Sequence, residues 1–237
     1  NMERLGDFVL QEGAMVVPGQ LRLVRNYHYV RIETAYAGET IEPLQYKGAF
    51  ITGQTTGVKA QINHVEVGTS TDQPTFYMRY SGVGTDNTTS VFAAGETLSC
   101  SIAVTNGSTS YSADDISLQV FSTAATGTGT GAVIQSGVYY LRGGFVEVPE
   151  QTIMLDKYRV NEANGKVGFT ITETVVTPES DSSLLDNAAG TSNYAAKGAH
   201  RLKVEAKLDS IPLGSTADSN FIMLMEVRNG DSLAPVN

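Results

Sequence analysis

Tryptophan is absent from this chain of 237 residues, and cysteine occurs once, as Cys100. One cysteine excludes an internal disulfide framework, so packing, hydrogen bonds or assembly with other chains must stabilise the fold. Cys100 lies in the alternating segment Leu98–Ile102, which predicts a strand with the thiol on its buried face. We therefore expect an inert thiol, because reactive cysteines need an exposed and electropositive setting.

Basic residues and long apolar runs are also scarce. The chain has 16 Lys and Arg against 25 Asp and Glu, a formal net charge of -9 and a pI near 4.8. Nucleic-acid-binding proteins need basic patches against the phosphates, so we expect no nucleic-acid partner. No run of 18 apolar residues occurs, so we expect no membrane-spanning segment and no membrane partner.

The start of the sequence lacks the basic region and apolar stretch of a secretory signal peptide. The first residue is Asn1, and the last segment, Ser232–Asn237, carries no obvious end signal. We therefore expect this chain to be a piece of a longer protein.

What is present favours short strands joined by many turns. Hydrophobic residues make up 41% of the chain and charged residues 17%, which is typical of a folded protein. Glycine occurs 24 times, and Thr, Ser and Val are plentiful. This composition predicts a mainly β fold.

Several segments have the alternation or β-branched content of strands. Tyr27–Ile32 is aromatic and β-branched, Val167–Thr172 alternates, and Leu202–Leu208 places apolar residues on one parity and charges on the other. The last of these predicts a strand with one buried and one wet face. Phe221–Met225 is apolar on both parities, which predicts a central strand or a strand at a subunit contact.

Local signals mark a hairpin and a bulge. Val138–Arg142 and Phe145–Val148 flank Gly143-Gly144, where glycines would supply the positive φ angles of a two-residue turn. The alternation changes phase near Asn63–His64, which predicts a β-bulge. Helical periodicity is scarce, with room for a turn or two in Lys157–Asn164 and Glu179–Ala189.

The chain is expected to form an antiparallel β-sandwich-like domain with a small inserted β-barrel-like module. The sandwich-like domain would comprise 1–47 and 126–237, because residues before Gly48 supply too few strands for a core. The module would comprise 48–125, and Ser122–Gly131, STAATGTGTG, would be a flexible linker. Contiguous halves are the alternative layout.

An aromatic residue followed by Gly-[Glu/Gln]-Thr recurs three times, at Tyr36–Thr40, Phe50–Thr55 and Phe92–Thr97. A turn that recurs between strands explains this echo most simply. The alternative is a module over about Gly48–Val104 made of two related hairpins.

Residues that could carry chemistry are present but poorly arranged. His28, His64 and His200 are far apart and match no metal motif, and the loop residues Asp181, Asp186 and Asn187 match no EF-hand. Asx-turns explain these loop residues better than a bound ion does. Gly127–Gly131 lacks the lysine of a phosphate-binding loop.

Paired carboxylates could form a glycosidase site, and the candidates are Asp114-Asp115, Glu147 with Glu150, and Glu173 with Glu179. Each is equally consistent with a solvated turn, and the absence of tryptophan disfavours a sugar-cleaving groove. No G-x-S-x-G nucleophile motif occurs. We expect no catalytic, cofactor-binding or metal-binding residues.

Three blocks of this sequence resemble baseplate and tail-fibre-connector proteins of tailed bacteriophages, notably marine ones. Gly48–Ala60 is similar to the family pattern G-x-x-I-x-G-x-T-S-G-A-x-A, with Phe76–Tyr80 and Phe92–Leu98 as its continuation. Ala132–Val146 resembles the second block. Leu184–Leu208 resembles the third, through D-N-A-x-G, N-Y-A-A and G-A-x-R-L-K. The resemblance covers about residues 40–210.

The resemblance implies a non-enzymatic virion structural protein, either a baseplate component or the adaptor that links tail fibres to the baseplate. It would be made in the host bacterial cytoplasm and reside in the virion tail. Its partners would be other tail and baseplate subunits and tail fibres, in a homotrimer or a wedge-like hetero-assembly. One alternative is a host-receptor or carbohydrate-binding module, which predicts exposed tyrosines on one face. Another is a polysaccharide depolymerase, which predicts two acids facing each other across a groove.

Overall fold

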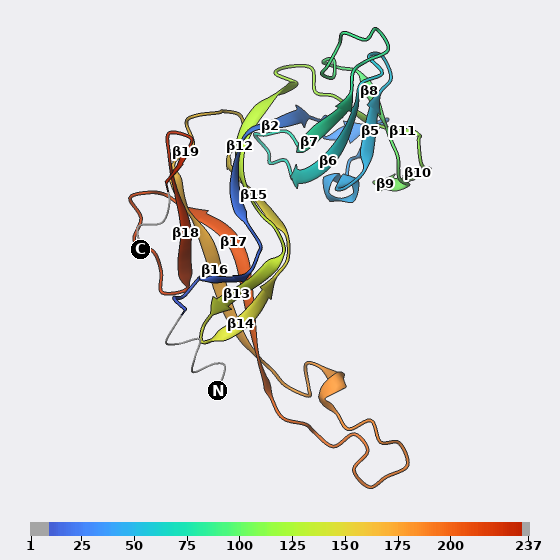
Figure 1. Cartoon of the computed structure of the whole chain (residues 1–237). Helices are drawn as coiled ribbons and strands as arrows, with labels where there is room; N and C mark the ends of the chain where they lie inside the picture. The colour runs from blue at the N-terminus through green and yellow to red at the C-terminus, as the bar shows by residue number, and fades with distance from the viewer. Residues whose placement is uncertain (1–9, 234–237) are drawn as a thin grey trace. The chain divides into compact units, whose positions relative to one another are not determined.

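The computed structural model describes residues 10–233 (Figure 1). Nearly all its regular elements are strands, and every strand pairing is antiparallel. Two short 3-10 helices, η1 (Pro43–Tyr46) and η2 (Ser182–Leu184), are the helical elements of the described range. The expected mainly β fold is confirmed. Within residues 10–233, no helix is long and apolar enough to cross a bilayer.

The chain forms two compact units. Unit 1 comprises the residues up to Leu23, Ala132–Ile153 and the residues from Asn164 on, and unit 2 comprises Val24–Gly131 and Met154–Ala163. The domains expected from the sequence, 1–47 plus 126–237 and 48–125, stay a prediction.

Unit 1 contains two small sheets. The first has the order β1-β13-β14, and the second has the order β17-β16-β18-β19. Their bounds are β1 Met15–Val17, β13 Gly137–Leu141, β14 Gly144–Val148, β16 Gly165–Val176, β17 Arg201–Ile211, β18 Phe221–Arg228 and β19 Asp231–Leu233.

The core of unit 1 lies between these two sheets. The ring of Tyr139 on β13 meets the ring of Phe169 on β16 edge to face, with centroids 4.9 Å apart. Phe169, Ile171 and Leu208 are buried on the covered face of β16 and β17. Burying each of these side chains stabilises the fold by about 1.5–3 kcal/mol. Because two sheets pack face to face over this core, unit 1 is sandwich-like.

Unit 2 is organised around a larger sheet with the strand order β11-β8-β5-β6-β7-β2-β12-β15. The chain passes between the units within β2, β12 and β15, and again between Ala163 and Asn164. The strands of this sheet are β2 Leu21–Arg31, β5 Phe50–Gly53, β6 Lys59–Glu66, β7 Thr75–Gly82, β8 Thr97–Cys100, β11 Ile116–Gln119, β12 Thr126–Ile134 and β15 Gln151–Asp156. Two hairpins complete the unit: β3 Ala35–Tyr36 with β4 Glu39–Thr40, and β9 Val104–Asn106 with β10 Thr109–Tyr111. Over the described residues, no sheet closes into a barrel.

The core of unit 2 contains Cys100 and a fully buried tyrosine. Cys100 is buried, and burial raises the pKa of its thiol, as expected for an inert residue. The Tyr46 hydroxyl lies 3.1 Å from the Asn106 amide oxygen, and the Asn106 amide nitrogen donates to the Ser117 carbonyl at 2.8 Å. These contacts satisfy polar groups that would otherwise destabilise the core.

The prediction of a flexible linker at Ser122–Gly131 is wrong, because most of this segment belongs to β12. Its glycines are needed where other groups approach closely. A Cβ at Gly127 would lie 2.7 Å from the Tyr29 hydroxyl oxygen, and one at Gly129 would lie 2.4 Å from the Lys157 carbonyl oxygen. The glycine-rich sequence thus provides close packing.

Predictions made from local sequence signals agree more closely with the structure. The predicted hairpin is present as β13–β14, but its turn residues are Arg142 and Gly143, with φ of 52° and 77°, and Gly144 already pairs with Leu141. The predicted bulge is confirmed by the register shift between Ile62 and His64. Of the two candidate helical segments, Glu179–Ala189 contains η2, and Lys157–Asn164 contains no helix.

Two of the three segments with the recurring Gly-[Glu/Gln]-Thr pattern contact each other. The buried Glu96 carboxylate accepts hydrogen bonds from the Thr55 and Thr56 amides, both at 3.1 Å, and from the Ala93 amide at 2.7 Å. Turns with positive φ occur at Gly38 and Gly95. Gly53 instead leaves room for Glu96, because a Cβ there would lie 2.5 Å from its carboxylate.

Candidate interaction surface

The most exposed apolar surface of unit 1 lies on the ribbon formed by β16 and β17. The paired residues Val175 and Leu202 are 58% and 63% exposed. They share one face with Glu173 and Val204, and Leu208 lies at the buried end of that face. The predicted one-sided strand is therefore present, but its apolar face is buried only toward Leu208.

The hairpin β13–β14 determines where this face becomes exposed. Arg142 at the turn of the hairpin forms an ion pair with Glu173, with Nε and Oε1 3.3 Å apart. The β16–β17 ribbon continues past the end of the β13–β14 hairpin (Figure 1). A groove of about 550 Å³ lies beside the hairpin turn, lined by Phe145, Leu202 and Val204 among others. Phe145 is 42% exposed.

The ribbon carries a long loop, residues 177–200, at its far end (Figure 1). The loop is held by backbone hydrogen bonds, including one of 2.8 Å from the Gly198 amide to the Leu184 carbonyl. A hydrogen bond from the Lys197 ammonium lowers the pKa of Glu179 to about 2. Tyr194 projects from this loop and is 61% exposed. We call the exposed ribbon, Thr172–Val176 with Arg201–Val204, together with this loop the arm.

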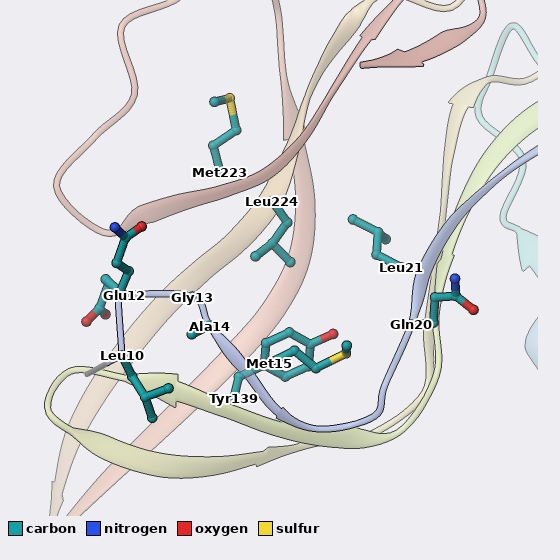
Figure 2. Close-up of a pocket in the computed structure, with 11 residues that line it drawn as sticks. Leu10, Glu12, Gly13, Ala14, Met15, Gln20, Leu21, Tyr139, Met223 and Leu224 are labelled. Atoms are coloured by element: carbon teal, nitrogen blue, oxygen red, sulfur yellow. The ribbon is translucent and has the colours of Figure 1, made fainter. Parts of the chain in front are cut away.

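A second apolar hollow in unit 1, of about 450 Å³, lies beside the described start of the chain. Its lining includes Met15, Leu21, Tyr139, Met223 and Leu224 (Figure 2). Met223 and Leu224 belong to the segment Phe221–Met225, predicted to be a central strand or a contact strand. That segment belongs to β18 and pairs with β16, whereas β19 pairs with Glu226–Arg228 further along β18. Its middle residues are half buried. The polar residues Gln11, Glu12 and Gln20 also line the hollow, so its lining is mixed.

Unit 2 contains a network of partly buried charges and tyrosines that the sequence analysis did not anticipate. Asp72 accepts a hydrogen bond from the Tyr158 hydroxyl, and its carboxylate lies 3.4 Å from the Lys157 ammonium and 3.6 Å from the Arg31 guanidinium. Lys157 also pairs with Glu66 at 3.4 Å. These residues lie far apart in the sequence, so no motif could have predicted the network.

The network shifts the pKa values of its members. Burial opposes the charge on Asp72, but the Tyr158 hydroxyl and the Lys157 ammonium lower the pKa of this carboxyl. The hydrogen bond with His64, 2.9 Å long, lowers the pKa of Glu66. Burial also disfavours the charge on Lys157, but the two carboxylates raise its pKa. All charges are paired, which suits a structural role in holding the segment Met154–Ala163 within unit 2.

The candidate metal ligands are not brought together. His28 and His64 lie on β2 and β6, whereas His200 lies just before β17. Asp181 accepts from the Ser183 amide at 2.9 Å and Asp186 from the Ala188 amide at 2.8 Å, so both form the expected local turns. In the part of the chain that the structure describes, no three His, Cys, Asp or Glu side chains cluster at a metal-binding distance.

The candidate acid pairs have local partners of their own. Glu173 pairs with Arg142, Glu179 pairs with Lys197, and Asp115 accepts from the Ser112 amide at 2.7 Å. Glu147 lines the groove beside the hairpin turn, but no second carboxylate lines it. The segment Gly127–Gly131, which lacks the lysine of a phosphate-binding loop, lies within β12.

Tyrosines do not form an exposed cluster. All eleven lie within the described range, and Tyr194 alone among them is exposed. Several others pack in ring contacts, such as Tyr29 against Tyr158 with centroids 5.1 Å apart. The aromatic face expected of a carbohydrate-binding module is therefore missing from the described residues.

Comparison with known families gives one match. A family model described as "Domain of unknown function (DUF4815)" matches residues 103–235. The chain matches no curated protein and no solved structure. The matched region includes β13, β14 and the whole arm.

Proposed function

This chain belongs to the DUF4815 family, whose description assigns no function, and we propose that it is a non-enzymatic structural protein of a bacteriophage tail. It serves as a baseplate component or as the adaptor that links tail fibres to the baseplate. It is made in the host bacterial cytoplasm and resides in the virion. Its partners are neighbouring tail and baseplate subunits and tail fibres.

The observation that carries this proposal is the arm. Val175 and Leu202 form an apolar pair that the described part of its own chain leaves uncovered, on a ribbon that ends in a loop with one exposed aromatic residue. Exposed apolar residues on a projecting element are typical of surfaces that become buried in an assembly. The three sequence blocks that resemble baseplate and connector proteins support the same conclusion, and the third block spans the arm.

The receptor-binding alternative is less well supported. It needs several exposed aromatic residues on one face, whereas Tyr194 is the single exposed tyrosine. The depolymerase alternative needs two acids facing each other in a groove. The candidate acids instead pair with Arg142, Lys197 or backbone amides.

The proposal is tested on the phage that encodes this chain. Purified virions should contain the protein by mass spectrometry, and labelling it should place it at the tail in electron micrographs. The purified protein should also bind at least one tail subunit of that phage in size-exclusion chromatography. Absence from the particle, or cleavage of host polysaccharide by the purified chain, would contradict the proposal.

A further inference from the structure

The outer edge of β17 is open beside the apolar face of the arm. β17 is the terminal strand of its sheet. The Gln151 side chain binds this edge, donating to the Ala206 carbonyl at 3.0 Å and accepting from the Leu208 amide at 2.7 Å. Since backbone groups alternate sides along an antiparallel strand, the N–H and C=O groups of Leu202 and Val204 point outward as well.

Nothing described in residues 10–233 pairs with these outward groups at Leu202 and Val204. Their side chains line the groove beside Phe145. An open strand edge next to a groove is the arrangement that accepts an added strand, with main-chain hydrogen bonds for affinity and side-chain pockets for specificity.

The charges on the polar face of β17 identify the strand that fits. They run Arg201, Lys203, Glu205, Lys207, so most added strands would place like charges together. A second copy of β17 can pair antiparallel about several centres. A two-fold axis at Lys203 places Lys203 opposite itself, and an axis at Glu205 places Glu205 opposite itself. Like charges directly opposite each other are destabilising.

An axis at Val204 avoids this conflict. It places Lys203 of each copy opposite Glu205 of the other copy. Both pairs are non-hydrogen-bonded pairs, in which side chains approach most closely. It also places Val204 opposite Val204 in a hydrogen-bonded pair. The new ladder ends on each side at Ala206, where Gln151 already binds the edge. The like-charged pair of this register, Arg201 with Lys207, falls where Gln151 already closes the edge.

We propose that the edge of β17 binds β17 of a second copy of this chain, antiparallel and two-fold about Val204. The two β16–β17 ribbons then form one continuous sheet, with both apolar faces on the same side. Lysines on edge strands commonly prevent such pairing, but here the alternating signs make this register complementary. An axis at Ala206 would also pair opposite charges, but Gln151 occupies the edge there. Lys203 and Glu205, now 2.8 Å apart within one strand, exchange that exposed ion pair for two pairs between strands.

Cysteine cross-linking tests the register. Val204→Cys should form a disulfide-linked dimer under mild oxidation, because Cα atoms of a hydrogen-bonded pair lie about 5.5 Å apart. Cys100 is buried and leaves the new thiol without a competitor. The matched control is Lys203→Cys, whose two thiols would lie on a diagonal and should not cross-link. Cross-linking by the control in place of Val204→Cys would overturn the proposed register.

Charge reversal tests the partner. Lys203→Glu should weaken dimerisation about tenfold in analytical ultracentrifugation, because two attractive pairs become repulsive. Glu205→Lys should do the same, and the double variant should restore the original affinity. Circular dichroism verifies that each variant is folded. A parent chain that stays monomeric at high concentration, or a double variant no better than the singles, would overturn the proposal.

This two-fold contact does not depend on a role in a virion. A dimer with the predicted cross-link could belong to any assembly, and a tail protein could be found in particles without it. The two sets of experiments therefore fail separately.

Discussion

At the scale of single residues, Asp72 shows how this chain replaces disulfides with polar contacts. Its carboxylate, in the loop before β7, contacts Tyr158, Lys157 and Arg31, which come from two distant segments. The Arg31 guanidinium also stacks over the Tyr158 ring, 5.4 Å from its centroid. Such contacts tie the returning segment Met154–Ala163 to unit 2 without a covalent bond.

Removing the charge of Asp72 should therefore destabilise unit 2. We expect Asp72→Asn to lower the free energy of unfolding by about 1–3 kcal/mol, because Lys157 and Arg31 each lose a charged partner in a partly buried site. Urea unfolding monitored by circular dichroism measures the change. Asp114→Asn is the matched control, since Asp114 is exposed and asparagine tolerates its φ of 69°. Equal stabilities of the two variants would contradict the structural role of the network.

The same residues predict a loss of stability in acid. The pKa values of Asp72 and Glu66 are lower in the folded chain than in the unfolded chain, so their stabilisation is present above their ordinary pKa and is lost as the pH falls through the folded values. We expect the urea concentration at the midpoint of unfolding to decrease as the pH falls below about 4. The double variant Asp72→Asn/Glu66→Gln should show a smaller fall between pH 7 and pH 3. An equal fall in the parent and the double variant would show that other groups cause the acid sensitivity.

At the scale of elements, sequence patterns predicted strands well and failed where distant segments meet. The bulge at Ile62–His64 and the β13–β14 hairpin follow from alternation and turn chemistry, which are local. The hairpin turn lies one residue earlier than predicted, because both glycines tolerate positive φ and the pairing of Leu141 with Gly144 selects the register. The strand β12 was not predicted, because its glycines are explained by Tyr29 and Lys157, which lie far away in the sequence.

This account of β12 can be tested with two glycines of unit 2. Gly129→Ala should lower the free energy of unfolding by about 1–3 kcal/mol, because the new methyl group would lie 2.4 Å from the Lys157 carbonyl oxygen. Gly82→Ala is the control, because nothing lies within 4 Å of a Cβ at that position. Thermal unfolding distinguishes the two variants. A harmless Gly129→Ala would mean that the glycines of β12 serve flexibility after all.

At the scale of the whole molecule, the candidate surface could be only partly predicted. The sequence correctly showed an alternating strand at Leu202–Leu208 and a polar, glycine-containing loop before it. It could not show that Leu202 and Val175 are exposed, because exposure depends on where the β13–β14 hairpin ends over the ribbon. The function resting on this surface is therefore tested by removing the loop of the arm while the two units stay intact.

Replacing residues 177–200 with Asn-Gly provides that test. Val176 and Arg201 are direct cross-strand partners, so a two-residue turn can join them without disturbing the ladder. We expect unfolding free energy within about 1 kcal/mol of the parent, because the loop is mostly exposed and few of its side chains are buried. Binding to neighbouring tail subunits, measured by size-exclusion chromatography of the mixed proteins, should be weakened, because the loop and Tyr194 are removed while Val175 and Leu202 remain. Tyr194→Ala is the narrower variant, and a graded loss from parent to Tyr194→Ala to the shortened arm would assign part of the contact to that ring. Undiminished binding by the shortened arm would show that the loop takes no part in the tail contact.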